Sequence, residues 1–289
     1  MRLTDLMVGK QWSDMEITGP IDACINGLTA DSREVEPGFL FAALDGLAAD
    51  GRAFIPDAIE RGARAILAPK GTPHPDIHEN IVFLESVLAR RDYALIAARY
   101  WGGQPDTIAA VTGTNGKTSV ADFTRQLWEL TGWPAASMGT LGLVSPAGIE
   151  SGGLTTPDAV TMSQTLAGLA SDGVNYLAVE ASSHGLDQYR LDGVVLSVAA
   201  FTNLSQDHLD YHGSMKAYRS AKWRLFAELL PTGGVAVLNA DDSNYEDLRS
   251  VVAERGCQVY SYGREGEDIR LLNATSNAYG QELYLEVFG

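Results

Sequence analysis

The sequence is poor in cysteine and in long apolar runs, and each shortage excludes a class of protein. Its two cysteines, Cys24 and Cys257, stand far apart and form no C-x-x-C pair, so neither a disulfide framework nor a cysteine-based zinc site is expected. No apolar run approaches the roughly 18 residues of a membrane span, and the start, MRLTDLMVGKQW, lacks an apolar core and a cleavage site. We expect a soluble cytoplasmic chain without membrane insertion.

Basic residues are also scarce. The chain has 37 acidic residues against 21 basic ones, a formal net charge of −16. Such a balance disfavours proteins that grip nucleic acid or an anionic membrane through a broad basic face. Any anionic ligand must therefore be held by local hydrogen-bond donors and by a few well-placed cations.

The 289 residues suffice for two domains, each with a core of its own. Strand-like apolar runs lie at 39–44, 64–68 and 80–84. They enclose a helix-like segment at 54–63, so residues 1–88 are predicted to form a small α/β domain. The Pro- and Gly-bearing stretch 69–80 is predicted to be a surface loop, and no metal role is expected for its His74 and His78.

Residues 89–289 are predicted to form a second, larger α/β domain. A helical pattern at 86–101 and the GGQPD break lead into an apolar strand at 107–112. Apolar strands that end in polar residues recur at 174–183, 194–208 and 234–242. This pattern indicates a mostly parallel sheet with helices on both faces and ligands at the carboxyl ends of its strands. The end of the chain, from Ile269, reads as two antiparallel strands at the edge of that sheet.

The stretch VTGTNGKTSV, at 111–120, combines a strand end, a glycine loop and a helix predicted at 117–132. In such a context backbone N–H groups point at a phosphate, Lys117 adds a charge and Thr118 offers a hydroxyl to Mg²⁺. The spacing differs from the common G-x-x-x-x-G-K-[ST] loop, because the only earlier glycine is Gly113. A tight strand-to-helix turn without a ligand is the alternative.

The short loop T-G-T-N-G-K-T-S resembles that of the Mur ligase family and its folylpolyglutamate synthase relatives, which form amide bonds after ATP phosphorylates a carboxylate. Residues 29–67 resemble the family's N-terminal UDP-binding domain. The stretches LTTPD (154–158), VEASSHGLDQYRL (179–191) and 201–226 resemble members that add the third residue of the peptidoglycan stem peptide. The resemblance implies ATP, Mg²⁺, the substrate UDP-N-acetylmuramoyl-L-alanyl-D-glutamate, and meso-diaminopimelate or L-lysine as the amino acid added.

The resemblance also assigns nucleotide and metal residues. It gives ATP the loop residues Gly113, Thr114, Asn115, Gly116, Lys117, Thr118 and Ser119, and the adenosine contacts Asn203, Asn239 and Asp242. It makes Lys117, Glu180, His208 and Lys222 catalytic, with Thr118, Glu180, His208 and a carbamylated Lys222 near Mg²⁺. The alternatives are that Glu180 caps the next helix, that His208, between two carboxylates, is a satisfied loop residue, and that Lys222 is an ordinary exposed lysine.

Substrate contacts follow from other segments that match the family. Ser32, Arg33, Asp50 and Gly51 match residues that cradle uridine and pyrophosphate. Thr155, Thr156, Ser182, Gln188 and Arg190 match positions that contact the muramyl peptide and diphosphate. His184 could bind ligand or support its loop, and the residues do not separate these roles.

In the family a third domain binds the incoming amino acid, and in the diaminopimelate-adding members it contains a D-N-P-R motif. No such string occurs in this sequence. We therefore expect a monomeric two-domain fragment that is inactive as a ligase alone. The alternatives are a non-catalytic module that binds nucleotide or partner proteins, and a kinase-like phosphotransferase. The coexistence of Glu180, His208 and Lys222 argues against the module. The unexplained ADSR and TTPD segments argue against the kinase.

Overall fold

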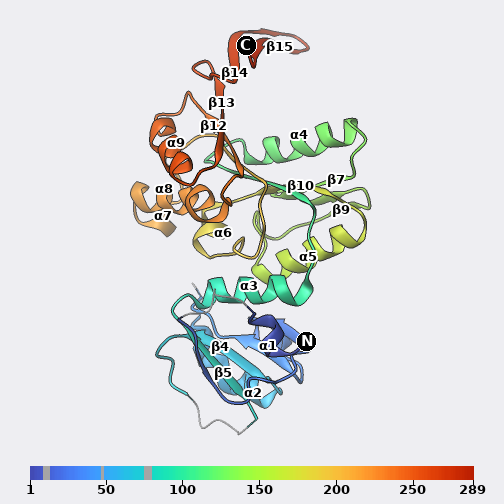
Figure 1. The fold of residues 1–289 in the computed structure, drawn as a ribbon, viewed down its shortest axis with the longest axis vertical. Coiled ribbons are helices and arrows are strands. Elements are labelled where there is room, and N and C mark those ends of the chain that lie inside the picture. Colours follow the sequence, from blue (N-terminus) through green and yellow to red (C-terminus); the bar gives the residue numbers. More distant parts are fainter. Residues whose placement is uncertain (9–13, 47–48, 75–79) are drawn as a thin grey trace. The chain divides into compact units, whose positions relative to one another are not determined.

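The computed structural model describes residues 1–8, 14–46, 49–74 and 80–289, which divide into two compact units. Unit 1 comprises Met1–Gly102, Asp158–Thr165 and Gln188–Gly193, and unit 2 comprises Gly103–Pro157, Leu166–Asp187 and Val194–Gly289. Helix α3 (Ala89–Trp101) therefore belongs to unit 1, although the sequence places it after the domain boundary (Figure 1). The boundary at residue 88 itself stays a prediction.

Unit 1 contains a five-stranded sheet of order β1-β5-β4-β3-β2. Its strands are β1 (Glu16–Thr18), β2 (Gly27–Thr29), β3 (Phe39–Ala42), β4 (Ala65–Pro69) and β5 (Val82–Ser86). Strands β2 to β5 run parallel and β1 is antiparallel at one edge. The helical elements are α1 (Leu3–Leu6), η2 (Ser32–Glu34), η3 (Gly51–Phe54), α2 (Ile55–Glu60) and α3.

Alternating side chains of this sheet build two separate hydrophobic clusters. Leu40 and Ala42 pack in one cluster with residues of α1 and α3, whereas Phe41 and Ala43 pack in the other with Ile55 of α2. This period of two is the geometry of a strand, so both faces of the sheet are covered by helices. The predicted small α/β unit is confirmed.

The predicted loop at 69–80 and its two histidines are described only in part. Strand β4 includes Pro69, and the loop residues 75–79, with His78, lie outside the described residues. The His74 Nε2 atom lies 2.7 Å from a carboxylate oxygen of Glu85, and the His74 ring contacts Phe83.

Unit 2 is built on a ten-stranded sheet of order β15-β14-β13-β12-β11-β6-β10-β7-β8-β9. Its strands are β6 (Thr107–Thr112), β7 (Ala135–Gly139), β8 (Gly142–Ser145), β9 (Gly148–Glu150), β10 (Tyr176–Glu180), β11 (Val198–Phe201), β12 (Val235–Asn239), β13 (Gln258–Gly263), β14 (Ile269–Asn277) and β15 (Gly280–Val287). The strands from β14 to β7 are parallel, and the pairs β14–β15, β7–β8 and β8–β9 are antiparallel. The parallel sheet and its antiparallel C-terminal edge confirm the prediction.

Helices connect these strands, as the pattern of buried parallel strands predicts. They are α4 (Lys117–Leu130), α5 (Ala159–Ser171), α6 (Ser183–Asp187), α7 (Leu209–His212), α8 (Met215–Arg224) and α9 (Tyr245–Glu254), with a π-helical turn η4 (Leu225–Leu229) after α8. The first residues of α5 are counted with unit 1. No helix among the described residues combines the length and the apolar character that a bilayer crossing requires.

Strand β6 marks the point where the strand order of unit 2 reverses. It lies between β10 and β11, so the chain moves to opposite sides of β6 as the sheet grows. Crevices at the carboxyl ends of strands form at such points. The loop that leaves β6 is the glycine loop singled out by the sequence.

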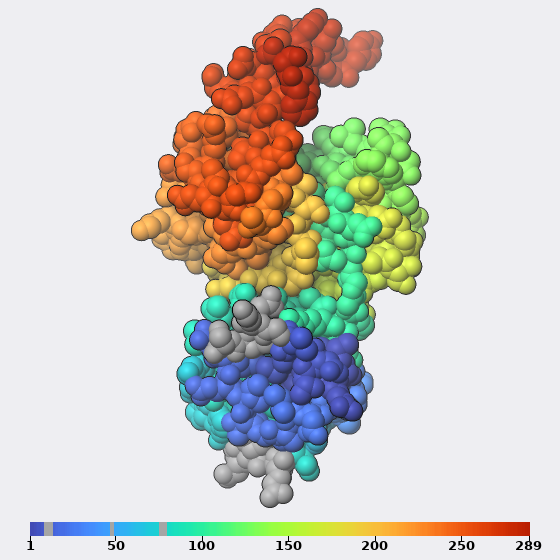
Figure 2. Space-filling view, viewed as in Figure 1, coloured from blue at the N-terminus to red at the C-terminus, as the bar shows by residue number. Residues whose placement is uncertain are grey.

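Four strands of unit 2 lack a signal in the sequence patterns used above: β7, β8, β9 and β13. Strand β7 reads AASMG, without β-branched or aromatic side chains, and is nevertheless fully buried beside β10. Strands β14 and β15, in contrast, were predicted from the sequence, and they form the C-terminal end of the chain, drawn in dark red in Figure 2.

Candidate functional site

The glycine loop links the end of β6 to the start of α4. Gly113 and Gly116 have φ values of 150° and 89°, which non-glycine residues rarely adopt. A Cβ atom on Gly113 would also overlap the side-chain oxygen of Thr202. The two glycines therefore allow the turn that places the N–H groups of the α4 N-terminus at the mouth of the loop.

Lys117 folds back over this loop. Its Nζ atom donates hydrogen bonds to the main-chain oxygens of Gly113 and Thr114, both at 3.0 Å. Burial lowers the pKa of Lys117, while the negative charges of Glu180 and Asp207 oppose that shift. A cation is thus held at the N-terminus of α4, as a phosphate site requires.

A cavity of about 230 Å³ opens at this loop within unit 2. It is lined by Thr114, Asn115, Gly116, Lys117, Thr118, Thr140, Thr155, Glu180, Ser182, Ser183, His208 and Lys222. The structure thus brings together the four predicted catalytic residues with the predicted substrate residues Thr155 and Ser182. These side chains come from widely separated parts of the sequence.

Glu180 ends strand β10 and is 1% exposed. Its Oε1 atom accepts a hydrogen bond from the main-chain N–H of Thr140 at 2.8 Å, and its Oε2 atom accepts one from the Thr140 hydroxyl at 3.4 Å. Gly139 lies so close that a Cβ atom there would overlap the carboxylate. The carboxylate is therefore held at the cavity by Thr140 and does not cap a helix.

Lys222 lies on α8 and is 1% exposed, so it is not the exposed helix lysine of the alternative. Its Nζ atom donates to the main-chain oxygen of Gly113 at 2.8 Å and lies 4.5 Å from the ring centroid of Tyr218. Burial, and then the positive charge of Lys117, lower the pKa of Lys222 to about 7. Much of this amine is therefore neutral near neutral pH, the form that reacts with CO₂.

His208 precedes helix α7 and has a positive φ of 51°. Its ring lies 4.8 Å from that of His184, and its Nε2 atom lies 3.5 Å from a carboxylate oxygen of Asp207. His184 also contacts the ring of Tyr211, at 4.1 Å. His184 thus contacts His208 and is not part of the cavity lining, which fits a supporting role for its loop.

The cavity lining suits Mg²⁺ only in company with phosphate. No cluster of three His, Cys, Asp or Glu side chains with metal-binding geometry occurs in the described parts of the chain. Mg²⁺ is often held by one or two carboxylates together with substrate phosphates, so it does not need such a cluster. The Glu180 carboxylate and the Thr118 hydroxyl beside a phosphate loop fit that donor set.

The predicted adenosine contacts hold loops together in the structure. Asn203 accepts a hydrogen bond from the N–H of Asn115 at 3.0 Å, and Asn239 donates to the carbonyl of Thr202 at 2.7 Å. Asp242 accepts from the N–H of Leu204 at 2.8 Å. None of these three residues lines the cavity, nor do the predicted loop residues Gly113 and Ser119, and their contacts to ATP stay predictions.

Thr156 is buried beneath the cavity and does not line it. Its hydroxyl donates to the carbonyl of Glu180 at 2.8 Å and lies 3.0 Å from the Ser182 hydroxyl. It joins the TTPD segment to the end of β10. Its neighbour Thr155 is at the cavity, where its hydroxyl lies 3.2 Å from that of Thr140.

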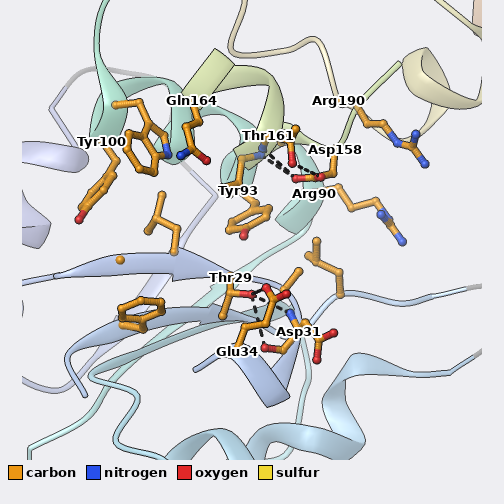
Figure 3. Close-up of a pocket in the computed structure, with 18 of the residues that line it drawn as sticks. Thr29, Asp31, Glu34, Arg90, Tyr93, Tyr100, Asp158, Thr161, Gln164 and Arg190 are labelled. Carbon is orange, nitrogen blue, oxygen red and sulfur yellow. Dashed lines mark hydrogen bonds between the residues drawn. The ribbon is translucent and has the colours of Figure 1, made fainter. Parts of the chain in front are cut away.

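A second, larger cavity of about 750 Å³ lies in unit 1 (Figure 3). Its lining comes from Asn26, Gly27, Leu28, Thr29, Ala30, Asp31, Glu34, Phe39, Leu44, Arg90, Tyr93, Tyr100, Trp101, Asp158, Ala159, Val160, Thr161, Gln164, Gln188 and Arg190. Gln188 and Arg190 are predicted substrate residues. A cavity of this size accommodates a ligand as large as a nucleotide sugar.

The predicted uridine residues do not line this cavity. The Arg33 side chain is 82% exposed and pairs with Asp31 at 2.5 Å, which lowers the pKa of Asp31 to about 2. Asp50 pairs with Arg52 at 2.6 Å and caps η3, which begins at Gly51. Ser32 is buried at the start of η2. Their contacts to uridine and pyrophosphate stay predictions.

Sequence patterns missed several lining residues. Thr140 follows β7, which itself had no pattern, and Ser183 lies inside the SSHGL motif without being singled out. In the larger cavity Arg90 and Tyr93 lie on α3, for which the sequence indicated a helix and no ligand contact. The paired arginines at positions 90 and 91 were the available signal.

Two family models match the chain. Residues 111–288 match the Mur ligase middle domain, and residues 24–94 match the Mur ligase family catalytic domain. A solved structure of UDP-N-acetylmuramoyl-L-alanyl-D-glutamate–2,6-diaminopimelate ligase superposes with a TM-score of 0.80 at 30% identity. The match covers 91% of this chain and 54% of that one. A MurF ligase from Thermotoga maritima in complex with ADP has a TM-score of 0.58 at 21% identity, over 92% of this chain and 56% of its own, which shows the fold alone.

Curated relatives carry the same ligase name. The protein from Caulobacter vibrioides is 53% identical over 274 residues, which cover 93% of this chain and 56% of the relative. The one from Bradyrhizobium diazoefficiens is 47% identical over 294 residues, which cover 99% of this chain and 58% of the relative. The chain thus spans little more than half the length of these relatives. Since the middle-domain match alone covers more than half of its residues, the chain belongs to the Mur ligase family.

Proposed function

We propose that the chain is the nucleotide- and substrate-binding part of an ATP-dependent ligase that adds the third amino acid to UDP-N-acetylmuramoyl-L-alanyl-D-glutamate. The observation that carries this proposal is the cavity in which a phosphate loop, Glu180, His208 and Lys222 meet. The names of the relatives support meso-diaminopimelate over L-lysine as the amino acid added. Which part of the ligase holds that amino acid stays a prediction.

In the proposed reaction ATP phosphorylates a substrate carboxylate, and the amine of the amino acid then displaces phosphate to form an amide. The loop N–H groups and Lys117 would bind the transferring phosphate and stabilise its charge. Mg²⁺, held by Glu180 and Thr118, would neutralise charge between the phosphate and the carboxylate. The Glu180 carboxylate is buried, which would strengthen its contacts because little water competes with them.

We propose further that Lys222 acts as a carbamate. Its neutral amine would add to CO₂, forming an N–C bond and releasing one proton, so that a buried cation becomes an anion beside Lys117. The burial of Lys222 and its lowered pKa support this step. With ¹³C-bicarbonate, a carbamate ¹³C NMR signal is expected in residues 1–289 and not in Lys222→Met. A wild-type spectrum without that signal at pH 8 would contradict the carbamate.

Hydroxylamine trapping tests the phosphorylation step without the amino acid. An acyl phosphate reacts with hydroxylamine to give a hydroxamate and phosphate, so ATP, Mg²⁺ and UDP-N-acetylmuramoyl-L-alanyl-D-glutamate should yield a substrate hydroxamate detectable by mass spectrometry. UDP-N-acetylmuramoyl-L-alanine, which lacks the glutamate, is the control and should give none. A chain that binds both ligands in calorimetry yet forms no hydroxamate would favour the non-catalytic binding module.

A further inference from the structure

Two adjacent arginines open helix α3 in unit 1. Arg90 and Arg91 lie in its first turn, where the N-terminal end of the helix dipole is positive. Cations at this end oppose the dipole, so helix stability does not explain them. An acidic partner would give each arginine a structural reason to lie there.

Arg91 has such a partner. Its Nε atom lies 3.7 Å from a carboxylate oxygen of Asp192, whose side chain is 3% exposed. Arg90, in contrast, donates to the main-chain oxygen of Asp45 and lines the large cavity. Within the described ranges no carboxylate forms an ion pair with Arg90. Arg90 thus lines the cavity without an ion pair to a carboxylate of the described residues.

The carboxylates that line this cavity have hydrogen-bond or ion-pair partners other than Arg90. Asp31 pairs with Arg33, and Glu34 accepts a hydrogen bond from the Thr29 hydroxyl at 3.2 Å. Asp158 caps α5 by accepting from the N–H groups of Val160 and Thr161 at 3.0 and 3.1 Å. In Figure 3 Asp31 and Glu34 lie at one wall, and Arg90 and Arg190 lie toward the other.

Packing fixes Arg190 near the same end of α3. The segment Gln188–Gly193 approaches the helix so closely that a Cβ atom on Gly193 would lie 2.6 Å from the carbonyl oxygen of Ala94. The Arg91–Asp192 pair joins the same two elements, one residue from Arg90 and two from Arg190. The Arg190 guanidinium donates to the neutral amide oxygen of Gln188 at 2.7 Å. Both arginines are therefore positioned before any ligand arrives.

We propose that Arg90 is a phosphate-binding residue of this cavity and that, together with Arg190, it holds the diphosphate of the nucleotide-sugar substrate. Guanidinium groups bind phosphate oxygens through two parallel N–H donors, and two such forks match a diphosphate. The need for them is greater in a chain of net charge −16, which repels anions at long range. The inference rests on the proposed function, because it takes the UDP-sugar as the ligand.

Titration calorimetry of residues 1–289 with UDP-N-acetylmuramoyl-L-alanyl-D-glutamate, UDP and uridine tests Arg90. Arg90→Gln is expected to weaken the first two ligands by about 10- to 100-fold, the range of a lost charged hydrogen bond. The affinity for uridine, which carries no phosphate, should change less than threefold. Arg64→Gln is the matched control, since it removes the same charge in unit 1 outside the cavity lining and should leave all three affinities unchanged.

Arg90→Lys keeps the charge and separates an ionic contact from packing. It is expected to recover at least a third of the affinity that Arg90→Gln loses. If the wild type binds the UDP-sugar and Arg90→Gln binds it equally well, the inference is overturned and the proposed function survives. If lysine is as weak as glutamine and both variants also lose affinity for uridine, Arg90 acts through packing and the inference is also overturned; a loss confined to UDP and the UDP-sugar would assign the contact to the two-donor guanidinium fork. A wild type that binds neither UDP nor the UDP-sugar refutes the proposed function itself.

Discussion

Lys222 is a single residue whose burial has a measurable consequence for stability. With a folded-state pKa of about 7 against an unfolded value of 10.5, the unfolded chain binds more protons at this site between those two pH values. The free energy of unfolding therefore rises with pH in this window, by up to about 1.4 kcal/mol per pH unit from this one group. Below pH 7 the folded chain carries the full penalty of a buried charge.

Lys222→Met removes that penalty while keeping a similar volume. In CO₂-free buffer the variant is expected to unfold at higher denaturant concentration than the wild type at pH 7, and the two free energies should converge as pH rises from 7 to 9. Urea unfolding at several pH values measures the difference. Parallel pH profiles for the two proteins would show that Lys222 is not titrating in this range.

Lys117 should matter for nucleotide alone. Lys117→Ala is expected to weaken ATP binding by about 10- to 150-fold, because a charged contact to phosphate is lost. The affinity for UDP-N-acetylmuramoyl-L-alanyl-D-glutamate should stay within threefold, since the large cavity does not include Lys117. Calorimetry with both ligands checks this, with the exposed Lys216→Ala as control. Unchanged ATP affinity in Lys117→Ala would show that the loop is not the phosphate site.

At the scale of elements, the end of β7 controls the carboxylate at the end of β10. Gly139→Ala would push a methyl group into Glu180, so the carboxylate must leave its bond to Thr140. We expect Mg²⁺-dependent ATP binding to fall at least tenfold with little change in far-UV circular dichroism. Gly168→Ala is the control: Gly168 lies within α5 with open space around it, and alanine there should stabilise the helix by about 0.5–1 kcal/mol. Wild-type ATP affinity in Gly139→Ala would show that the Glu180 position is not needed.

The N-terminus of α5 also depends on one residue. Asp158 accepts three hydrogen bonds, from the N–H groups of Val160 and Thr161 and from the Thr161 hydroxyl at 2.6 Å. Asp158→Ala is expected to lower the free energy of unfolding by about 1 kcal/mol, whereas Asp158→Asn, also a good cap, should lose about half of that or less. Denaturant unfolding measures both. Equal losses in the two variants would mean that the charge matters rather than the cap.

Elements with a strong local sequence pattern could be predicted, and elements without one could not. Strand β6 occupies the predicted 107–112, because TIAAVT is apolar, β-rich and bounded by a glycine loop. Strand β7, AASMG, carries no such pattern, and it is defined by its pairing with β10, whose residues follow their partners by 41 positions in the chain, as Tyr176 follows Ala135. Thr140, whose N–H group holds the Glu180 carboxylate, could not be predicted for the same reason.

In the candidate site, too, residues within sequence motifs could be predicted, whereas properties that depend on tertiary packing could not. Motif residues such as Lys117, Glu180, His208 and Lys222 could be assigned to one site from the sequence by family resemblance, and the structure brings them to one cavity. The neutral amine at Lys222 depends on burial among Lys117, Tyr218 and Gly113, which no local pattern encodes. Arg33 and Asp50 were also assigned by family resemblance, but in the structure their side chains form ion pairs with residues two positions away and do not line the large cavity.

At the scale of the whole molecule, unit 1 is built from three separate stretches of chain. Residues 158–165 and 188–193 belong to it although they follow β6 and the phosphate loop in sequence. They supply Ala159 and Val160 to the hydrophobic cluster that contains α1 and α3. They also supply part of the large cavity: Asp158, Ala159, Val160, Thr161, Gln164, Gln188 and Arg190.

This arrangement predicts that the N-terminal segment alone is not a substrate-binding module. A polypeptide of residues 1–102 keeps the sheet of unit 1 but lacks Arg190 and the α5 wall of the cavity. We expect it to bind UDP-N-acetylmuramoyl-L-alanyl-D-glutamate at least 100-fold more weakly than residues 1–289 in calorimetry, and to melt at lower temperature because its α1–α3 cluster is uncovered. The double variant Gln188→Ala, Arg190→Ala in residues 1–289 removes two wall residues without truncation, and should weaken binding even if the short polypeptide does not fold. A folded 1–102 that binds as tightly as the longer chain would place the substrate on the exposed side of unit 1, near Arg33 and Asp50, and would restore the residues that the sequence motifs favoured.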